Sequence, residues 1–319
     1  MKLTQKRRQL GLRVGRAIFI IALTALCTSA LTISTFSLDL RTQTSTLSLQ
    51  TVTIQSAAIQ SPATELKQEP NVATKSRSDK LPNSAGPQER AQAACDAGRN
   101  HAVEAIPMLV SMLGDDTKTE PLNCWNGGRW HPALETFKQP SPGETAAIAL
   151  ASMGVPAFEP LTNELANGNA SVRRNAAWAI GELTNMSPQK RASAVPQLVS
   201  LLSDSDDWVR MAAARALGEL RDERAGERLI TALSDTQWRV RELAAWALSE
   251  MKDERSVNAL CNVLLTDDQA EVRRTAAEAL GEIRSSEAIT SLKQALNDPE
   301  PRVRTKAGWA ISEIEDTGG

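Results

Sequence analysis

The chain is poor in aromatic residues: it has no tyrosine, and all aromatics together make up 3% of its 319 residues. Hydrophobic residues nevertheless reach 41%. Alanine and leucine, which favour helices, carry most of that share, whereas aromatic and β-branched residues favour strands. We therefore expect an all-α protein with closely packed helices.

Histidine and cysteine are also scarce, with two and four residues respectively. His101, His131 and Cys124 do not form a ligand set at any spacing typical of a metal site. No nucleophile with a matched base stands out either. The sequence therefore predicts no metal, no cofactor and no catalytic residue.

Charged residues are absent from positions 17–38, directly after a start that carries six cations and no acid. Two interpretations of residues 1–38 stay open. A signal peptide fits the small residues that follow a short apolar stretch, and a retained signal anchor fits the 22 uncharged residues, which are long enough to cross a bilayer. Either one predicts an extracytoplasmic protein, periplasmic or secreted, with a membrane contact if the segment is not cleaved.

The remainder of the chain is acidic, because loss of the six N-terminal cations changes the net charge from −2 to −8. Such a protein is a poor match for nucleic acid, whose phosphates attract a basic surface. Residues 39–86 are rich in Ser, Thr, Gln and Pro and have few large apolar residues, which predicts a disordered linker. The repeat domain is expected over residues 87–319.

A Val-Arg pair recurs along this domain at intervals of 37, 31, 32 and 31 residues. The valines are Val172, Val209, Val240, Val272 and Val303. Self-similarity at this period indicates stacked helical hairpins. An Asp or Asn stands five residues before each valine, and apolar residues stand two and six residues before that marker, which predicts six hairpins when Asp115 is included.

The repeated Arg and the repeated Asp predict an ion-pair row along the array. Each Arg lies six residues after the marker of its own unit, and we expect it to bond to the marker turn of the neighbouring unit. The residues concerned are Asp204, Arg210, Asp235, Arg241, Asp267, Arg273, Asp298 and Arg304. A charge pair repeated in every unit is typical of a stacking interface, so we assign these residues to the fold.

Helical geometry divides the second helix of each hairpin into two faces. At 100° per residue, positions 0, 4, 7, 8 and 11 after the valine form one apolar stripe, and positions 2, 3, 6 and 10 lie on the other side. The second set is expected to be exposed on the concave face of the array. Its candidate partner-binding residues are Trp178, Arg215, Trp246, Glu278 and Trp309 at position 6 and Glu182, Glu219, Glu250, Glu282 and Glu313 at position 10.

Both rows have a structural alternative. The tryptophans either recognise a partner or pack against the neighbouring repeat. The glutamates either attract a basic segment of a partner or serve the fold. The segments from Val209 to Glu219 and from Val272 to Glu282 resemble HEAT-like repeats of the bilin-lyase (PBS lyase) family over about residues 88–315.

That resemblance implies a right-handed α-solenoid of about six stacked helical hairpins. It implies little about activity, because the family includes scaffolds, bilin lyases and iron-dependent deoxyhypusine hydroxylases. Ala102 and Pro132 follow the two histidines where the hydroxylases carry His-Glu pairs, so the iron sites are not expected. We expect a non-catalytic scaffold that binds a protein or peptide; an enzyme of the lyase or hydroxylase type and a structural spacer of an envelope assembly are the alternatives.

The first hairpin differs from the others by an insertion at about 116–141. It holds Trp125, Arg129, Trp130 and His131, which predict either a functional loop or a cap over the first repeat. Export permits a disulfide between Cys95 and Cys124 that pins this insertion. Cys261 fills a slot that leucine holds elsewhere, which predicts a buried, inert thiol.

Overall fold

The computed structural model describes residues 85–120, 122, 141–183 and 186–316, and these residues are all-helical with no strand among them. The order of elements is α2 (Pro87–Arg99), η1 (Val103–Ala105), α3 (Ile106–Met112), α4 (Pro142–Met153), α5 (Val155–Glu164), α6 (Ala170–Glu182), α7 (Pro188–Ala192), α8 (Val195–Leu201), α9 (Asp207–Leu220), η3 (Glu223–Ala225), α10 (Gly226–Ala232), α11 (Trp238–Met251), η4 (Glu254–Ser256), α12 (Val257–Thr266), α13 (Ala270–Ile283), η5 (Ser286–Ala288), α14 (Ile289–Ala295) and α15 (Pro301–Glu315). The segment predicted at 1–38, nearly all of the linker and the centre of the insertion lie outside the described residues.

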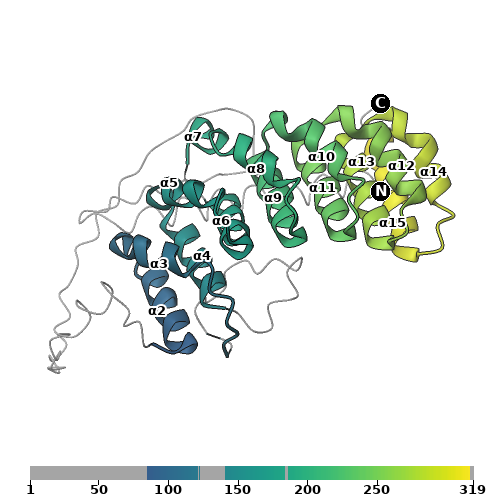
Figure 1. Cartoon of the computed structure of the whole chain (residues 1–319). Helices are drawn as coiled ribbons and strands as arrows, with labels where there is room; N and C mark the ends of the chain where they lie inside the picture. The colour runs from purple at the N-terminus through teal and green to yellow at the C-terminus, as the bar shows by residue number, and fades with distance from the viewer. Residues whose placement is uncertain (1–84, 121, 123–140, 184–185, 317–319) are drawn as a thin grey trace, which may run out of the picture. The chain divides into compact units, whose positions relative to one another are not determined.

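Six helical hairpins stack along the described part of the chain, in the order of the sequence (Figure 1). They are α3/α4, α5/α6, α8/α9, α10/α11, α12/α13 and α14/α15, and α2 packs on α4 before the first of them. Each second helix packs on the second helix of the next unit, from α4 to α15. The α-solenoid and its six hairpins confirm the prediction from the repeat.

The predicted apolar stripe forms the core. In α13, for example, Val272, Ala276, Ala279 and Leu280 are fully buried, and Ile283 is nearly so. Alanines at positions 4 and 5 after the valine let neighbouring second helices approach closely. A helix of this kind is stabilised mainly by the packing of its apolar face.

The predicted ion-pair row is present and joins each unit to the next. Arg173, Arg210, Arg241 and Arg273 each donate two hydrogen bonds to the marker aspartate of the following unit, at 2.6–3.0 Å. The same guanidinium also donates to the carbonyl of its own marker residue, as Arg210 does to Asp204 at 2.8 Å. We call this row the Arg-Asp ladder.

Each marker aspartate serves two units at once. Its side chain accepts a hydrogen bond from the backbone N–H two residues later, as Asp298 does from Glu300 at 2.8 Å, and this turn starts the second helix. Hydrogen bonds from Arg273 hold the pKa of Asp298 below its usual value. Because the carboxylate stays ionised, it fixes both the turn inside its unit and the contact to the preceding unit.

The alignment of the fifth unit needs a correction. Leu265 and Cys261 were assigned to the buried leucine slots, but Leu265 is 42% exposed and Cys261 is half-buried. Leu264 and Leu260, one residue earlier, fill those slots at 1% and 0% exposure. α10 and α12 start 31 residues apart, but α12 has 10 residues and α10 has 7. The interval from Val240 to Val272 is one residue longer than its neighbours, and this extra residue shifted the assignment.

Cys261 is nevertheless a free thiol in the structure. It lies beside Ser291 of α14, and partial burial raises its pKa. A raised pKa leaves less thiolate at neutral pH. The low reactivity of Cys261 stays a prediction, whereas its full burial in a leucine slot was wrong.

Candidate interaction surfaces

The second helices α6, α9, α11, α13 and α15 present positions 6 and 10 in two neighbouring rows, which we call the second-helix ridge. The ridge contains every described candidate for partner binding. Full exposure was expected there, and the structure corrects that expectation. All three tryptophans are half-buried and pack against the hydrophobic core.

Two of these tryptophans lie on a glycine of the preceding unit. A methyl group added to Gly218 would stand 2.5 Å from the ring of Trp246, and one added to Gly281 would stand 2.7 Å from the ring of Trp309. Packing against the neighbouring repeat was one of the two alternatives, and it occurs. Whether the exposed edge also binds a partner stays a prediction.

Arg215 departs most from the expected exposure, because its side chain is almost fully buried. It forms an ion pair with Glu182 of the preceding unit and another, at 3.5 Å, with Glu219 of its own helix. Helical geometry alone places Arg215 on the free face of α9, but in the array a neighbouring helix covers this face. Arg215 is therefore part of the stacking interface.

Arginines of the array neutralise most of the predicted acidic row. Glu250 pairs with Arg221, and Glu313 pairs with Arg284 at 2.6 Å. Both arginines are the left-handed C-terminal residues of the preceding second helix, a conformation that is uncommon outside glycine. With Glu182 and Glu219 held by Arg215, Glu282 is the position-10 acid without an ion pair in the described part of the chain.

A chain of alternating charges crosses the C-terminal half of the ridge and was missed by the sequence argument. Arg274 lies 3.0 Å from Glu278 of its own helix and 4.0 Å from Glu242 of α11. Lys306 of α15 reaches Glu278 at 2.8 Å, and its ammonium lies 4.6 Å from the centre of the Trp309 ring. The signal was present, because these residues occupy positions 2, 3 and 6 of successive units.

Burial raises the pKa of Glu242, since its carboxylate is largely shielded and Arg274 is at the limit of an ion pair. The charge chain therefore starts at an acid that is not fully compensated and ends at a cation lying over an aromatic ring. Such a mosaic of aromatic and charged groups is typical of protein interfaces.

The N-terminal end of the ridge is organised by the residues that lead into the insertion. Asp116 forms an ion pair with Arg174 at 2.9 Å, and Asn175 is buried and donates to the carbonyl of Leu113 at 2.7 Å. The indole N–H of Trp178 is buried and has no acceptor among the described residues. Burial also raises the pKa of Glu144, which caps α4 through the backbone N–H of Ser141.

The remaining candidates lie largely beyond the described ranges. Trp125, Arg129, Trp130, His131 and Cys124 belong to the part of the insertion that is not described. Cys95 is buried in α2 and takes part in a disulfide, while its partner lies outside the described residues. The Cys95–Cys124 pairing therefore stays a prediction.

A second row of hydrogen bonds, which was not predicted, joins three successive units at the segments that precede α8, α10 and α12. Asp253 accepts from Arg255, and the guanidinium of Arg255 donates to the carbonyl of Glu223 in the preceding unit at 3.0 Å. Arg224 reaches Ala192 in the same way at 2.7 Å. Gly226 leaves room for this contact, because an added methyl group would stand 2.1 Å from the Asp253 carboxylate and that side chain would have to shift.

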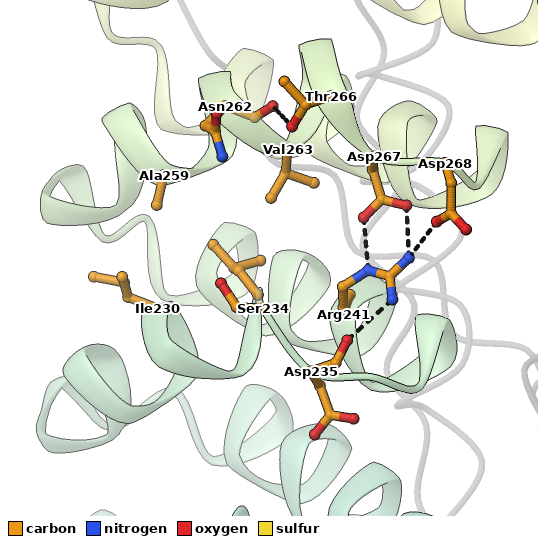
Figure 2. Close-up of a pocket in the computed structure, with 11 residues that line it drawn as sticks. Ile230, Ser234, Asp235, Arg241, Ala259, Asn262, Val263, Thr266, Asp267 and Asp268 are labelled. Carbon is orange, nitrogen blue, oxygen red and sulfur yellow. Dashed lines mark hydrogen bonds and ion pairs between the residues drawn. The ribbon is translucent and has the colours of Figure 1, made fainter.

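A groove of about 430 Å³ lies between α10 and α12, on the first helices of two successive units. Figure 2 shows Ile230 and Ser234 on one side and Ala259, Asn262 and Val263 on the other. One end is formed by Arg241 with Asp267 and Asp268, a rung of the Arg-Asp ladder. This size is within the range of ligand pockets, which runs from about 300 to 1,000 Å³.

Neither a metal site nor a membrane helix is found in the part of the chain that the structure describes. No group of three or more His, Cys, Asp or Glu residues has suitable geometry among the described residues, and none of their helices is long and apolar enough to cross a membrane. His101 lies at the end of α2, with its ring nitrogen 3.1 Å from the carbonyl of Ser152.

Comparison with known families agrees with this architecture. The family model for HEAT repeats matches residues 158–249, 195–269 and 257–318, and these matches together span half of the chain. The chain belongs to the HEAT-repeat family. The matches cover α5 to α15, so this family membership rests on the units that carry both the Arg-Asp ladder and the groove.

Solved structures show similarity at low identity. An engineered protein shares 22% identity over 66% of this chain and 96% of its own, with a TM-score of 0.46. The complex of CpcE and CpcF of phycocyanin lyase from Nostoc shares 22% over 74% and 98%, with a TM-score of 0.39. Human deoxyhypusine hydroxylase shares 22% over 73% and 82%, with a TM-score of 0.37.

These likenesses carry no argument about the activity of this HEAT-repeat chain. No curated protein matches it significantly.

Proposed function

We propose that this HEAT-repeat array is a non-catalytic scaffold that binds a protein or peptide on the C-terminal half of the second-helix ridge. Solenoids of stacked hairpins present extended surfaces to partners. The observation that supports this site is the continuous mosaic from Glu242 to Trp309, in which charged and aromatic side chains of three successive helices adjoin.

The chemistry of the partner follows from the charges left over on the ridge. Glu182 shows that position 10 of one unit lies beside position 6 of the next, because it contacts Arg215. By the same repeat, Glu282 lies beside Trp309, and it has no ion pair among the described residues. A basic side chain of the partner, placed on the Trp309 ring and beside Glu282, combines an ion pair with a cation–π contact.

Affinity capture from the native source with the full chain tests the proposal. Trp309→Ala is expected to weaken capture of the partner by about 1–4 kcal/mol, the range of an interface hot spot. Trp246→Ala and Trp178→Ala are expected to act in the same direction. The matched control is Trp238→Ala, since this half-buried tryptophan also carries a cation, Arg239, at 5.1 Å from its ring but stands off the ridge.

If capture is unchanged in all three ridge variants while the melting temperature falls sharply, the tryptophans serve packing alone and the proposal is wrong. Glu282→Arg separates the two effects, because it reverses a charge without removing a packed ring. It is expected to reduce capture with little loss of stability.

We further propose that the protein is exported and either released or anchored by its N-terminal segment. The six cations followed by 22 uncharged residues support this location, and so does the disulfide at Cys95, since disulfides persist in oxidising compartments. Fractionation and protease accessibility of the native protein test it. Recovery of the full-length protein from the cytoplasm would contradict it.

Peptide mapping without reduction identifies the partner of Cys95, and we expect Cys124.

Two other functions have direct tests. Absorbance changes on addition of a bilin or of iron would favour an enzyme of the lyase or hydroxylase type. Failure of every ridge variant to affect any captured protein would favour a spacer in an envelope assembly.

A further inference from the structure

The groove between α10 and α12 lies in the part of the array that carries one extra residue. Successive Val-Arg pairs from Val209 to Val303 are 31, 32 and 31 residues apart, and the longer interval contains α12. In units four and six the order before the marker is Leu233-Ser234-Asp235 and Leu296-Asn297-Asp298. In unit five Leu265 is added between the buried Leu264 and Thr266.

The walls of the groove come from one stripe on each helix. Ala259, Asn262, Val263 and Thr266 follow the spacing of one helical face of α12, and Ile230, Leu233 and Ser234 do the same on α10. Leu233 and Val263 are buried and form an apolar floor, while Ser234, Asn262 and Thr266 are exposed at the rim. The groove therefore offers apolar contact below and hydrogen-bonding groups above (Figure 2).

The Arg241 end of the groove carries an excess of acid. At one end the single guanidinium of Arg241 serves Asp267 and Asp268, and the Asp268 side chain is 74% exposed. Beyond the other end, Arg255 of η4 approaches Glu227 of α10 at 3.7 Å. The C-terminal ends of α10 and α12 lie at the Arg241 end of the groove, and helix C-termini favour cations.

Asp268 is the group that is free to accept a further donor. Hydrogen bonds from Gln269 and the charge of Arg241 lower its pKa, so it is ionised at neutral pH. A carboxylate has about four acceptor positions. Arg241 at 2.6 Å and the amide of Gln269 at 3.3 Å occupy only part of them.

We propose that this groove is a second docking surface, separate from the ridge, that takes a short extended peptide segment with an apolar side chain next to a lysine or arginine. The apolar side chain lies on Leu233 and Val263, and the neighbouring cation reaches Asp268. Charge complementarity decides between occupants: an acidic or uncharged segment leaves the carboxylates at the Arg241 end without a partner.

Fluorescence polarisation with the full chain and labelled hexapeptides tests the proposal. The probe is alternating Leu-Lys, and the two controls are alternating Leu-Glu and alternating Gly-Lys. We expect the Leu-Lys peptide to bind at least about tenfold more tightly than either control, because each control lacks one of the two interactions. Stronger or equal binding of the Gly-Lys peptide would overturn the proposal.

Variants locate the binding. Asp268→Lys is expected to weaken Leu-Lys binding about fivefold or more. Glu287→Lys makes the same charge change on the exposed turn before α14, away from the groove lining, and is expected to leave binding unchanged. Equal losses in both variants would show general charge attraction and would refute the site.

Two further variants change the groove without changing its charge. Ala259→Trp fills the space between α10 and α12, and removal of Leu265 gives unit five the length of its neighbours. Both are expected to abolish binding of the Leu-Lys peptide while the helical circular dichroism is retained. If both fold and still bind, the groove is not the site; loss of binding in Trp309→Ala instead would assign the peptide to the ridge, and that result would leave the proposed scaffold function standing.

Discussion

Close packing between units predicts opposite effects for the same substitution at two glycines. Gly218 lies in α9, where an added methyl group would meet the Trp246 ring at 2.5 Å and the Cα and Cβ atoms of Ala247 at 3.0 Å. Gly308 lies in α15, where the methyl group would meet only the Leu296 side chain, at an ordinary 3.7 Å. Both are helical, so alanine brings the same gain in helix propensity, about 0.5–1 kcal/mol.

The clash decides whether each substitution raises or lowers the free energy of unfolding. Overpacking typically costs about 1–3 kcal/mol, so Gly218→Ala is expected to destabilise the protein by about 1–2 kcal/mol after the propensity gain. Gly308→Ala is expected to stabilise it by about 0.5–1 kcal/mol. At about 2–4 °C per kcal/mol for a domain of this size, thermal unfolding separates the two variants by roughly 3–12 °C.

A double variant attributes the loss to the ring. Trp246→Ala removes the nearest atom, so Gly218→Ala should cost less in that background than in the wild type, a coupling that a double-mutant cycle measures. Because repeat arrays often open one unit at a time, hydrogen exchange of the α9 and α11 amides should complement the melting curve. Equal stabilisation by both glycine substitutions would refute the close approach of the Trp246 ring to α9.

Three further outcomes follow from the ladder and the buried acid. Arg273→Ala removes two hydrogen bonds to Asp298 and is expected to lower the free energy of unfolding by about 2–4 kcal/mol. Arg304 donates only to carbonyls of its own unit among the described residues, so Arg304→Ala should lower it less, and chemical denaturation compares the two variants. Because the pKa of Asp298 is lowered in the folded state, the ionised carboxylate stabilises the fold above its unfolded pKa of about 4, and this stabilisation is lost as the pH falls further. The loss of stability caused by Arg273→Ala should therefore shrink in acid. A loss that does not change with pH would contradict the ion pair. Burial raises the pKa of Glu242 and therefore destabilises its ionised form, so Glu242→Gln should raise the melting temperature at pH 7 but not near pH 4. An unchanged melting temperature at pH 7 would show that Arg274 compensates the charge of Glu242.

The fold was predictable because each unit repeats the same constraint. Five valines with apolar residues at the same later positions define one face of five helices, and the structure buries that face. The Arg-Asp ladder was predictable for the same reason, since Arg210 and Asp235 belong to a series and not to a single pair. Because the pattern repeats in five units, an irregular residue in one unit does not prevent its recognition.

The surface was less predictable, because helical geometry describes one helix at a time. Trp246 stands opposite the apolar stripe of α11 and yet is half-buried, since the neighbouring helix α9 covers it. The sequence contains a sign of this contact: Gly218 precedes Trp246 by 28 residues, and Gly281 precedes Trp309 by the same interval. A large ring in one unit and a missing side chain in the preceding unit indicate packing between units.

The groove illustrates how an irregular residue escapes a periodic alignment. The interval of 32 residues between Val240 and Val272 required one added residue, and counting back from Asp267 placed it before α12. A residue added inside a helix rotates everything beyond it by about 100°, which would move the apolar stripe away from the core. Only at the C-terminal end does the addition spare the stripe, and there Leu265 projects to solvent while Leu260 and Leu264 stay buried. Because the fold tolerates the extra residue only at this end, the groove lined by Thr266 lies in the unit in which the repeat is irregular, and we infer that this irregular position is the most informative one for function.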